Sequence, residues 1–255
     1  GIAKWVTRMA NRPSCDVPEI QIKSGTLSEE QISAICVAIS KPLSIITGGP
    51  GTGKTTVITE IIKHQTSNGR KLDVVSFTGK AVSRIREVTK FAHAATMHQV
   101  LTVANPEKEI DHLIIDESSM VPLELLHKFI ERFKPKQVTL IGDKDQLEPI
   151  GWGAVFEQLL KCREQVPIVR LTKVYRTGSR GITSNLEAIR EPRDEDDPPV
   201  NLEDGENFTM FPGDSGSVSL IMEMMKNAGI TSDRITVITA YNKDVGNINL
   251  ICQQV

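Results

Sequence analysis

The stretch GGPGTGKTT, Gly48–Thr56, decides the fold. It contains the pattern G-x-x-x-x-G-K-[ST], it follows an apolar run and it precedes a helical pattern, which is the context that this pattern requires. The glycines let backbone N–H groups turn toward phosphate oxygens, and the start of the helix adds positive potential. The alternative, a plain glycine-rich turn, does not require the strand before it and the helix after it.

We therefore expect a bound nucleoside triphosphate, ATP, together with Mg²⁺. Lys54 would reach the β- and γ-phosphates, and the Thr55 hydroxyl would be a ligand of Mg²⁺. The residues that we expect around the phosphates are Gly49, Pro50, Gly51, Thr52, Gly53, Lys54, Thr55 and Thr56.

A second pattern, LIIDESSM at Leu113–Met120, is an apolar run that ends in two acids. Open α/β sheets bind their ligands at the carboxyl ends of strands, which is where Asp116 and Glu117 would lie. Asp116 suits the Mg²⁺ shell, and Glu117 could polarise an attacking water molecule. Adjacent acids after a strand are often solvated loop residues, but the phosphate loop upstream favours the catalytic interpretation.

Short β-branched runs alternate with helical patterns along the chain, which indicates an α/β fold with a parallel sheet covered by helices on both faces. Thr26 and Glu29 form the pattern of a capping box before one helix, and Pro122 opens another. A third helical pattern starts at Ile182, and a fourth covers Val245–Val255. The predicted strands are Leu43–Thr47, Leu72–Phe77, His112–Ile115, Gln137–Ile141, Ile168–Leu171 and Ile235–Thr239.

The composition fits a globular chain: 255 residues, 39% hydrophobic and 24% charged, with a net charge of -2. No apolar run approaches the ~20 residues of a bilayer helix, and no leader opens the sequence. The four cysteines are far apart, so we expect reduced thiols and an intracellular location, without a structural zinc site. Residues 1–100 are net basic and the remainder is net acidic, which allows a local basic groove.

Four further stretches follow in order: SFTGKAVSRI (Ser76–Ile85), ATMHQVL (Ala95–Leu101), GDKDQLEPIGWG (Gly142–Gly153) and LTKVYRTGSRGI (Leu171–Ile182). With the phosphate loop and the acid pair, this set resembles a superfamily 1 helicase. The stretches TGKA and DQLEPIG resemble the RecD-like, 5′→3′ branch rather than the UvrD-like branch. The resemblance implies a P-loop NTPase built from two RecA-like domains with ATP between them.

Applied to this sequence, the resemblance implies boundaries and roles. We expect an N-terminal arm or the remnant of a preceding domain at 1–24, a first RecA-like domain at 25–165 and a partial second one at 166–255, with an acidic loop at 191–206. Four positions match ATP-site residues of the family: Gln31 would read adenine, Gln146 would sense the γ-phosphate, Tyr175 would stack on the base and Arg176 would be an arginine finger. A solvent-facing glutamine and a core tyrosine are the alternatives for Gln31 and Tyr175.

The resemblance also implies contacts with single-stranded DNA, and RNA is not excluded. Thr78, Gly79 and Lys80 match one strand-binding loop, and Thr96 and His98 match a second contact. Hydroxyls, backbone amides and a lysine are reasonable phosphate ligands that read no sequence. Trp152 could stack on a base or pack at the seam between the domains, and Arg84, Arg86 and Lys90 either add positive potential or form a solvated helix face.

The expected function is therefore an ATP-dependent 5′→3′ DNA helicase, an ATP hydrolase that moves along single-stranded DNA. The family's last motifs would follow Val255, so we expect weak hydrolysis and no unwinding from residues 1–255 alone. An ATP-gated nucleic-acid-binding or loading module that never unwinds is the second hypothesis. A small-molecule phosphotransferase is the third, and no feature of the sequence favours it.

Overall fold

The computed structural model of the chain describes residues 1–14, 27–103, 105, 108–175 and 216–229. The chain divides into two compact units, Gly1–Thr177 and Gly178–Val255. The second unit contributes one described helix, α9 (Gly216–Asn227). The sheet and the candidate site both belong to the first unit.

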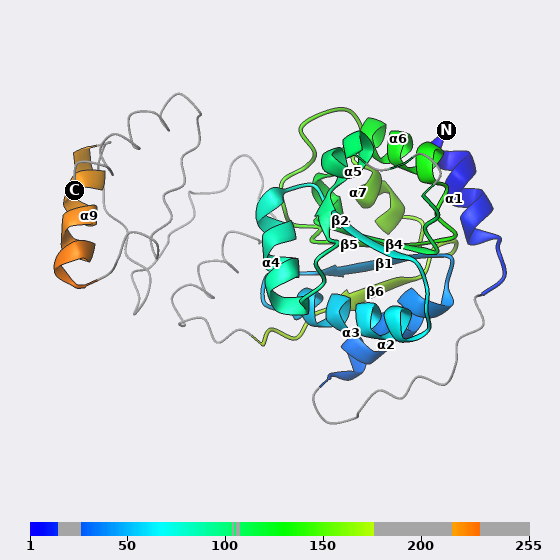
Figure 1. Cartoon of the computed structure of the whole chain (residues 1–255), viewed down its shortest axis with the longest axis horizontal. Helices are drawn as coiled ribbons and strands as arrows, with labels where there is room; N and C mark the ends of the chain where they lie inside the picture. The colour runs from blue at the N-terminus through cyan, green and yellow to red at the C-terminus, as the bar shows by residue number, and fades with distance from the viewer. Residues whose placement is uncertain (15–26, 104, 106–107, 176–215, 230–255) are drawn as a thin grey trace, which may run out of the picture. The chain divides into compact units, whose positions relative to one another are not determined.

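The first unit is built on a parallel sheet of six strands in the order β3-β2-β4-β5-β1-β6 (Figure 1). The strands are β1 (Leu43–Gly48), β2 (Leu72–Ser76), β3 (Ala95–Thr96), β4 (His112–Asp116), β5 (Gln137–Gly142) and β6 (Ile168–Leu171). β1, β2, β4, β5 and β6 match predicted strands, and the two-residue β3 was not predicted. The predicted parallel α/β sheet is confirmed.

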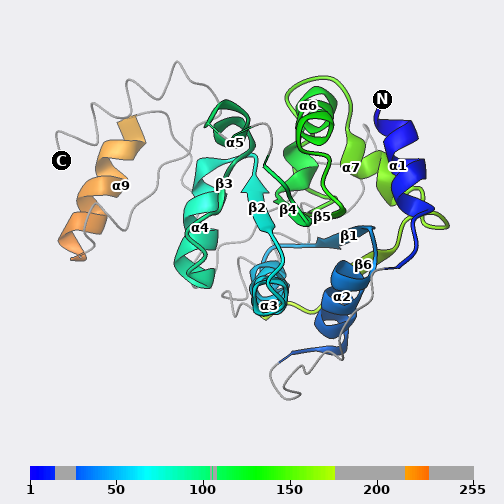
Figure 2. The same cartoon turned by 45° about the vertical axis from the view of Figure 1, so that its right-hand side comes forward.

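Helices cover both faces of the sheet. Successive side chains along a strand point to opposite faces, so each buried strand contributes apolar side chains to a cluster on either side. Ile45 joins the apolar cluster under α1, α5, α6 and α7, while Ile46 joins the cluster under α2, α3 and α4. Figures 1 and 2 show these layers on opposite sides of the strands. The helices are α1 (Ile2–Ala10), α2 (Glu29–Ser40), α3 (Lys54–Ser67), α4 (Gly79–Thr89), α5 (Met97–Val103), α6 (Leu123–Phe133) and α7 (Val155–Leu160).

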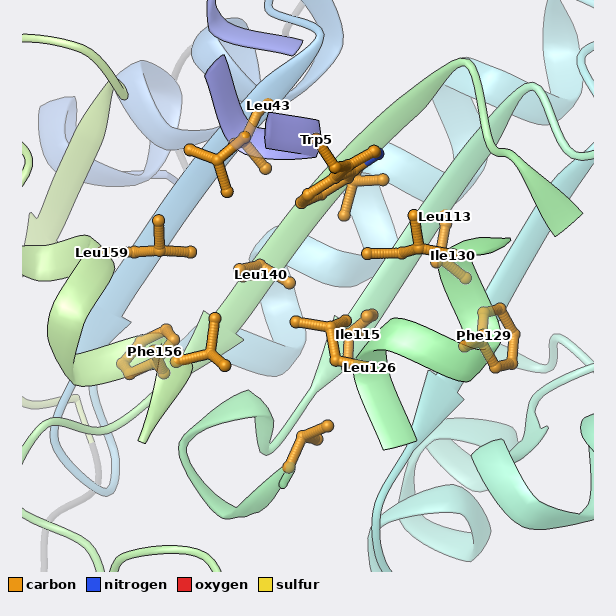
Figure 3. Packing of buried hydrophobic residues seen from close by; sticks show 14 of the residues in the cluster. Trp5, Leu43, Leu113, Ile115, Leu126, Phe129, Ile130, Leu140, Phe156 and Leu159 are labelled. Atoms are coloured by element: carbon orange, nitrogen blue, oxygen red, sulfur yellow. The ribbon is translucent and has the colours of Figure 1, made fainter. Parts of the chain in front are cut away.

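The first of these two layers contains most of the large side chains (Figure 3). Leu140 and Ile115 on the strands belong to the same cluster as Phe129 of α6 and Phe156 of α7, and Ile115 lies beside Leu126. Each such side chain contributes roughly 1.5–3 kcal/mol when it is fully buried. The packing holds the ends of β4 and β5 in fixed positions, and the candidate site lies at these ends.

Three sequence expectations about boundaries need correction. Residues 2–10 form a helix whose Trp5 and Met9 enter the core, whereas the sequence showed no strong period there and predicted an arm or the remnant of a preceding domain. β6 pairs with β1 in the first sheet, so the first unit continues past the expected boundary at residue 165 to Thr177. Helix α2 is capped by Ser28, not by Thr26, because its third residue supplies the reciprocal hydrogen bond.

Other expectations lie outside the described residues: the strand at Ile235–Thr239, the helices from Ile182 and at Val245–Val255, and the acidic segment 191–206. None of the helices in the described part of the chain has the length and apolar character needed to cross a bilayer.

Candidate active site

A cavity of about 380 Å³ opens at the carboxyl ends of β1 and β4. Because all six strands are parallel, residues far apart in the sequence meet at this edge of the sheet. The predicted residues that line the cavity are Gly49, Pro50, Gly51, Gly53, Lys54, Thr55, Thr56, Asp116, Glu117, Gln146 and Tyr175. The structure thus brings the phosphate loop, the acid pair and Gln146 together in one place.

The phosphate loop is a tight turn that contains two residues with left-handed backbone. Gly51 has φ 81° and Gly53 has φ 88°, conformations that residues with a Cβ rarely adopt. Lys54 Nζ donates hydrogen bonds to the carbonyl oxygens of Gly48 at 2.6 Å and Gly49 at 3.1 Å. The Thr52 hydroxyl donates to Gly49 O at 2.8 Å, which closes the turn. The lysine amine therefore lies inside the loop, at the position where a phosphate would bind.

Gln31 lies behind the phosphate loop and is not a solvent-facing helix residue, since it is 3% exposed. Its Oε1 accepts a hydrogen bond from Ser28 N, and its Nε2 donates to Thr52 O at 3.5 Å. A Cβ on Gly53 would collide with this amide, so Gln31 and the loop fit closely together. The contact of Gln31 with adenine stays a prediction. The hydrogen bond to Thr52 O holds the Gln31 side chain against the phosphate loop.

The two acids at the end of β4 lie in an electrostatically unfavourable place. Asp116 is 8% exposed, and burial, followed by the charge of Glu117, raises its pKa to about 6, although Lys54 and Arg84 oppose the shift. Glu117 has φ 52°, a left-handed conformation that is uncommon for a residue with a side chain. Its Oε2 is buried and has no hydrogen-bond partner among the described residues. Strained backbone and unsatisfied polar atoms cluster at functional sites, which supports the catalytic interpretation.

The donors at this end of the cavity fit Mg²⁺. The hydroxyl of Thr55 and the carboxylate of Asp116 both line it, and oxygen ligands are those that a hard cation prefers. A divalent cation would also relieve the repulsion between Asp116 and Glu117 that contributes to the raised pKa of Asp116. Thr55 and Asp116 are therefore a chemically suitable pair of ligands.

Two further predicted residues complete the lining. Gln146 Oε1 accepts a hydrogen bond from the Ser119 hydroxyl at 3.4 Å, which links it to the segment after the acid pair. The backbone N–H of Tyr175 donates to Gly51 O at 2.9 Å, and the ring is 42% exposed and therefore not a core tyrosine. Arg176, the predicted arginine finger, lies outside the described residues.

The predicted nucleic-acid contacts lie at the same edge of the sheet, after β2 and β3. Thr78 caps α4, which starts at Gly79 and continues through Lys80, and its hydroxyl accepts a hydrogen bond from Ala81 N at 3.3 Å. The Thr96 hydroxyl likewise accepts from Gln99 N at 3.2 Å. These hydroxyls have structural roles and can still donate their protons to a ligand.

His98 packs its ring against Phe77, with centroids 6.0 Å apart. This contact gives the histidine a structural role, and nothing in the described residues tests its predicted contact with nucleic acid. Phe77 directly precedes the first predicted strand-binding segment, and His98 is part of the second, in α5.

Trp152 stands almost free of the described residues, with 92% of its surface exposed. Its carbonyl accepts a hydrogen bond from Leu123 N at 3.1 Å, so the backbone is held while the indole ring projects outward. Leu147 and Ile150 of the same loop are also exposed. Stacking of Trp152 on a base and its packing at the seam between the domains both stay predictions.

Sequence reasoning missed part of the cavity lining. Ala81, Arg84 and Ile85 on one face of α4 also line it, whereas the sequence suggested for Arg84 either added positive potential beside the strand or a solvated helix face. Their i, i+3 and i+4 spacing places them on one side of the helix. That signal was present in the sequence, but only the strand order shows that this side faces the site.

Known proteins resemble this chain in sequence and in fold. Residues 26–203 match the family described as "AAA domain". The RecBCD enzyme subunit RecD of Mycolicibacterium smegmatis is 29% identical over 214 residues, which is 70% of this chain and 38% of that protein. The ATP-dependent RecD2 DNA helicase of Deinococcus radiodurans is 34% identical over 163 residues, or 60% of this chain and 22% of that protein. The predicted resemblance to RecD-like helicases is thereby confirmed.

Among solved structures, the Pif1 helicase from Candida albicans has a similar fold, with a TM-score of 0.50 and 20% identity over 80% of this chain and 55% of that one. The chain spans less than two fifths of the length of the two curated relatives described above. The similarity therefore concerns only a part of each of these relatives.

Proposed function

This chain belongs to the AAA domain family, and we propose that it is the ATPase region of a 5′→3′ DNA helicase that moves along single-stranded DNA. The observation that carries the proposal is the cavity itself. It collects Lys54, Asp116, Glu117 and Gln146 from the ends of three strands. The RecD and RecD2 relatives support the type of motor.

In the proposed reaction, water attacks the γ-phosphorus, the new P–O bond forms and the bond to the leaving ADP oxygen breaks. Glu117 takes the proton from that water, and its buried Oε2, without a partner among the described residues, is available as the acceptor. Lys54 exchanges its bonds to Gly48 and Gly49 carbonyls for phosphate oxygens. Gln146 accepts a hydrogen bond from the Ser119 hydroxyl, and from this position it would orient the γ-phosphate.

Mg²⁺, held by Thr55 and Asp116, would neutralise phosphate charge when bound. Gln31 would read the adenine and Tyr175 would stack on it. Arg176 would add a cationic charge to the transition state, as its match to the family's arginine finger implies. Phosphoryl transfer needs little covalent help, so positioning and electrostatics account for the proposed catalysis.

Binding of the strand would occur beside the cavity, at the same edge of the sheet. Thr78, Gly79 and Lys80 begin α4, and the next turn of α4 lines the cavity. Together with Thr96 and His98 they would bind phosphates without reading sequence. A change in the nucleotide could thus reach the strand through one rigid helix, which is how hydrolysis would be coupled to movement.

The ATPase proposal is tested by Lys54→Ala. We expect ATP hydrolysis, with and without single-stranded DNA, to fall by at least about 100-fold, because the charge that binds the phosphates is removed. The matched control is Lys63→Ala on the exposed side of the same helix, where the lysine pairs with Glu60. Wild-type turnover by a folded Lys54→Ala variant would show that the cavity is not the ATP site.

The strand-binding proposal is tested by Lys80→Ala. Fluorescence anisotropy with oligonucleotides of several sequences should show an affinity that falls with salt and is nearly indifferent to sequence. Lys80→Ala should reduce the salt slope by about one, because one phosphate contact is lost. An unchanged slope would remove Lys80 from the strand site, and strand displacement on a tailed duplex by a longer chain would separate a helicase from a loading module.

A further inference from the structure

Arg84 is a charged residue of the cavity to which the proposed function assigns no role. It lies on α4, and it lines the cavity together with Lys54, Asp116 and Glu117. The strand order explains this position, because α4 follows β2 and β2 pairs with β4, with Ser76 opposite Asp116. The first turns of α4 therefore stand beside the acid pair.

The backbone of Arg84 is held by its helix, while the residue itself is exposed. Val82 and Ile85 on the same helix are buried in the core cluster under α2, α3 and α4, which anchors α4 against the sheet. Ala81, one turn before Arg84, presents only a methyl group to the cavity and leaves room for a guanidinium. Arg84 shares the lining of the cavity with Asp116 and Glu117, which form its acidic end.

We propose that Arg84 is a binding residue for the γ-phosphate of ATP, reaching it from the α4 side while Lys54 reaches it from the phosphate loop. This inference rests on the proposed function, which places the γ-phosphate at the end of the cavity that holds Asp116 and Glu117. Among the described lining residues, Lys54 and Arg84 are the cationic side chains, and they face two acids. A triphosphate adds several negative charges there, and a planar guanidinium binds phosphate oxygens through two parallel hydrogen bonds.

The assignment predicts discrimination between nucleotides. ADP lacks the γ-phosphate, so removing Arg84 should weaken a non-hydrolysable ATP analogue far more than it weakens ADP. Loss of a charge-assisted hydrogen bond corresponds to about a 10- to 100-fold loss of affinity. A merely structural arginine would change both affinities together.

The experiment measures the affinity of fluorescent ADP and of a fluorescent non-hydrolysable ATP analogue, both with Mg²⁺, for wild type, Arg84→Ala and Arg84→Lys. Arg84→Ala should lose about 10- to 100-fold for the ATP analogue and less than about threefold for ADP. Arg84→Lys should fall between wild type and alanine, because an ammonium keeps the charge but not the paired hydrogen bonds. Lys90→Gly is the matched control, since it removes a charge from the exposed end of the same helix at a left-handed position that suits glycine.

Equal losses of affinity for the two nucleotides, or unchanged affinity for both, would overturn the assignment. Thermal unfolding without nucleotide would show whether an equal loss comes from a folding defect. Lys54→Ala separates the two levels of inference. If wild type binds the ATP analogue and Lys54→Ala does not, the proposed ATP site stands. The Arg84 variants then test the γ-phosphate assignment alone. If wild type binds neither nucleotide, the proposed function and this inference fail together.

Discussion

The two ends of the parallel strands differ in how their polar groups are satisfied. At the amino edge, Asp111 accepts hydrogen bonds from Lys71 N at 2.9 Å and Lys136 Nζ at 2.7 Å, and these donors lower its pKa. At the carboxyl edge, burial and Glu117 raise the pKa of Asp116 to about 6. Two acids at the two ends of the same strand region thus have shifts of opposite sign.

A chain of buried hydrogen bonds near the amino edge shows the same contrast. Gln65 Nε2 donates to His112 Nδ1 at 2.9 Å, His112 Nε2 lies 2.9 Å from Thr139 Oγ1, and Thr139 lies 3.0 Å from Ser44. Burial lowers the pKa of His112 to about 3, so the ring is neutral, with its proton on Nε2. Gln65 Oε1 is an exception within this group, since it has no partner among the described residues.

At the carboxyl edge, three buried oxygen atoms have no hydrogen-bond partner among the described residues: Thr47 Oγ1 in β1, Ser76 Oγ in β2 and Glu117 Oε2 after β4. A buried polar atom without a partner costs roughly 1–3 kcal/mol. The difference teaches that this protein satisfies polar groups more completely at the amino ends of the strands than at the carboxyl ends, where the candidate site lies. We therefore expect the groups that serve the proposed activity to lower the stability of the sheet.

The largest expected effect that tests this comparison is on catalysis. Glu117→Gln should lower ATP hydrolysis by about 10²- to 10⁴-fold, because an amide keeps the shape of the side chain and cannot accept the proton. Affinity for ATP with Mg²⁺ should remain within a few-fold of wild type. Steady-state turnover and nucleotide binding measure the two quantities, and Glu148→Gln, an exposed acid, is the control. If affinity falls as much as rate, Glu117 is a binding residue.

The next effect is on the amino edge. His112→Phe should lower the free energy of unfolding at pH 7 by about 3 kcal/mol, because the ring is replaced but its hydrogen bonds to Gln65 and Thr139 are lost. Urea unfolding measures the change. His127→Phe, at an exposed position on α6, should have little effect.

The same pair of proteins gives a pH test. Because the folded-state pKa of His112 is depressed to about 3, its contribution is fully present above its ordinary pKa of 6.5 and is lost as the pH falls toward 3. The stability difference between wild type and His112→Phe should therefore narrow between pH 7 and pH 5. A constant difference over that range would mean that the histidine is not buried in the neutral form.

The smallest expected change in stability has the opposite sign and belongs to the carboxyl edge. Asp116→Asn should raise the free energy of unfolding of the nucleotide-free protein by about 2 kcal/mol at pH 7 to 8, while it abolishes hydrolysis with Mg²⁺. The folded-state pKa of Asp116 is raised, so the cost of its charge appears as the pH rises from 3.8 to about 6 and is complete above that. Urea unfolding at pH 8 and pH 4 is the measurement, and at pH 4 the two proteins should be nearly equal. A destabilised variant at pH 8 would contradict the expectation that the groups of the proposed activity lower the stability of the sheet.

Local patterns in the sequence predicted the strands β1, β4 and β5, the phosphate loop and the acid pair. Each of these depends on a few neighbouring residues: an apolar run, a glycine spacing or a pair of acids at a strand end. Parallel strands then bring their carboxyl ends to one edge, so the meeting of Lys54, Asp116 and Glu117 could be expected before the structure was known.

Only the tertiary structure decided which strands are neighbours and what each helix faces. Because β6 pairs with β1, the first unit extends beyond the boundary predicted at residue 165. Because β2 pairs with β4, α4 stands beside the acid pair and Arg84 lines the cavity. The left-handed backbone of Glu117 and the place of Gln31 behind the loop also depend on contacts across the fold. These features could not be read from the sequence, because strand pairing and burial join residues that are distant in the chain, whereas periodicity and motif spacing describe only near neighbours.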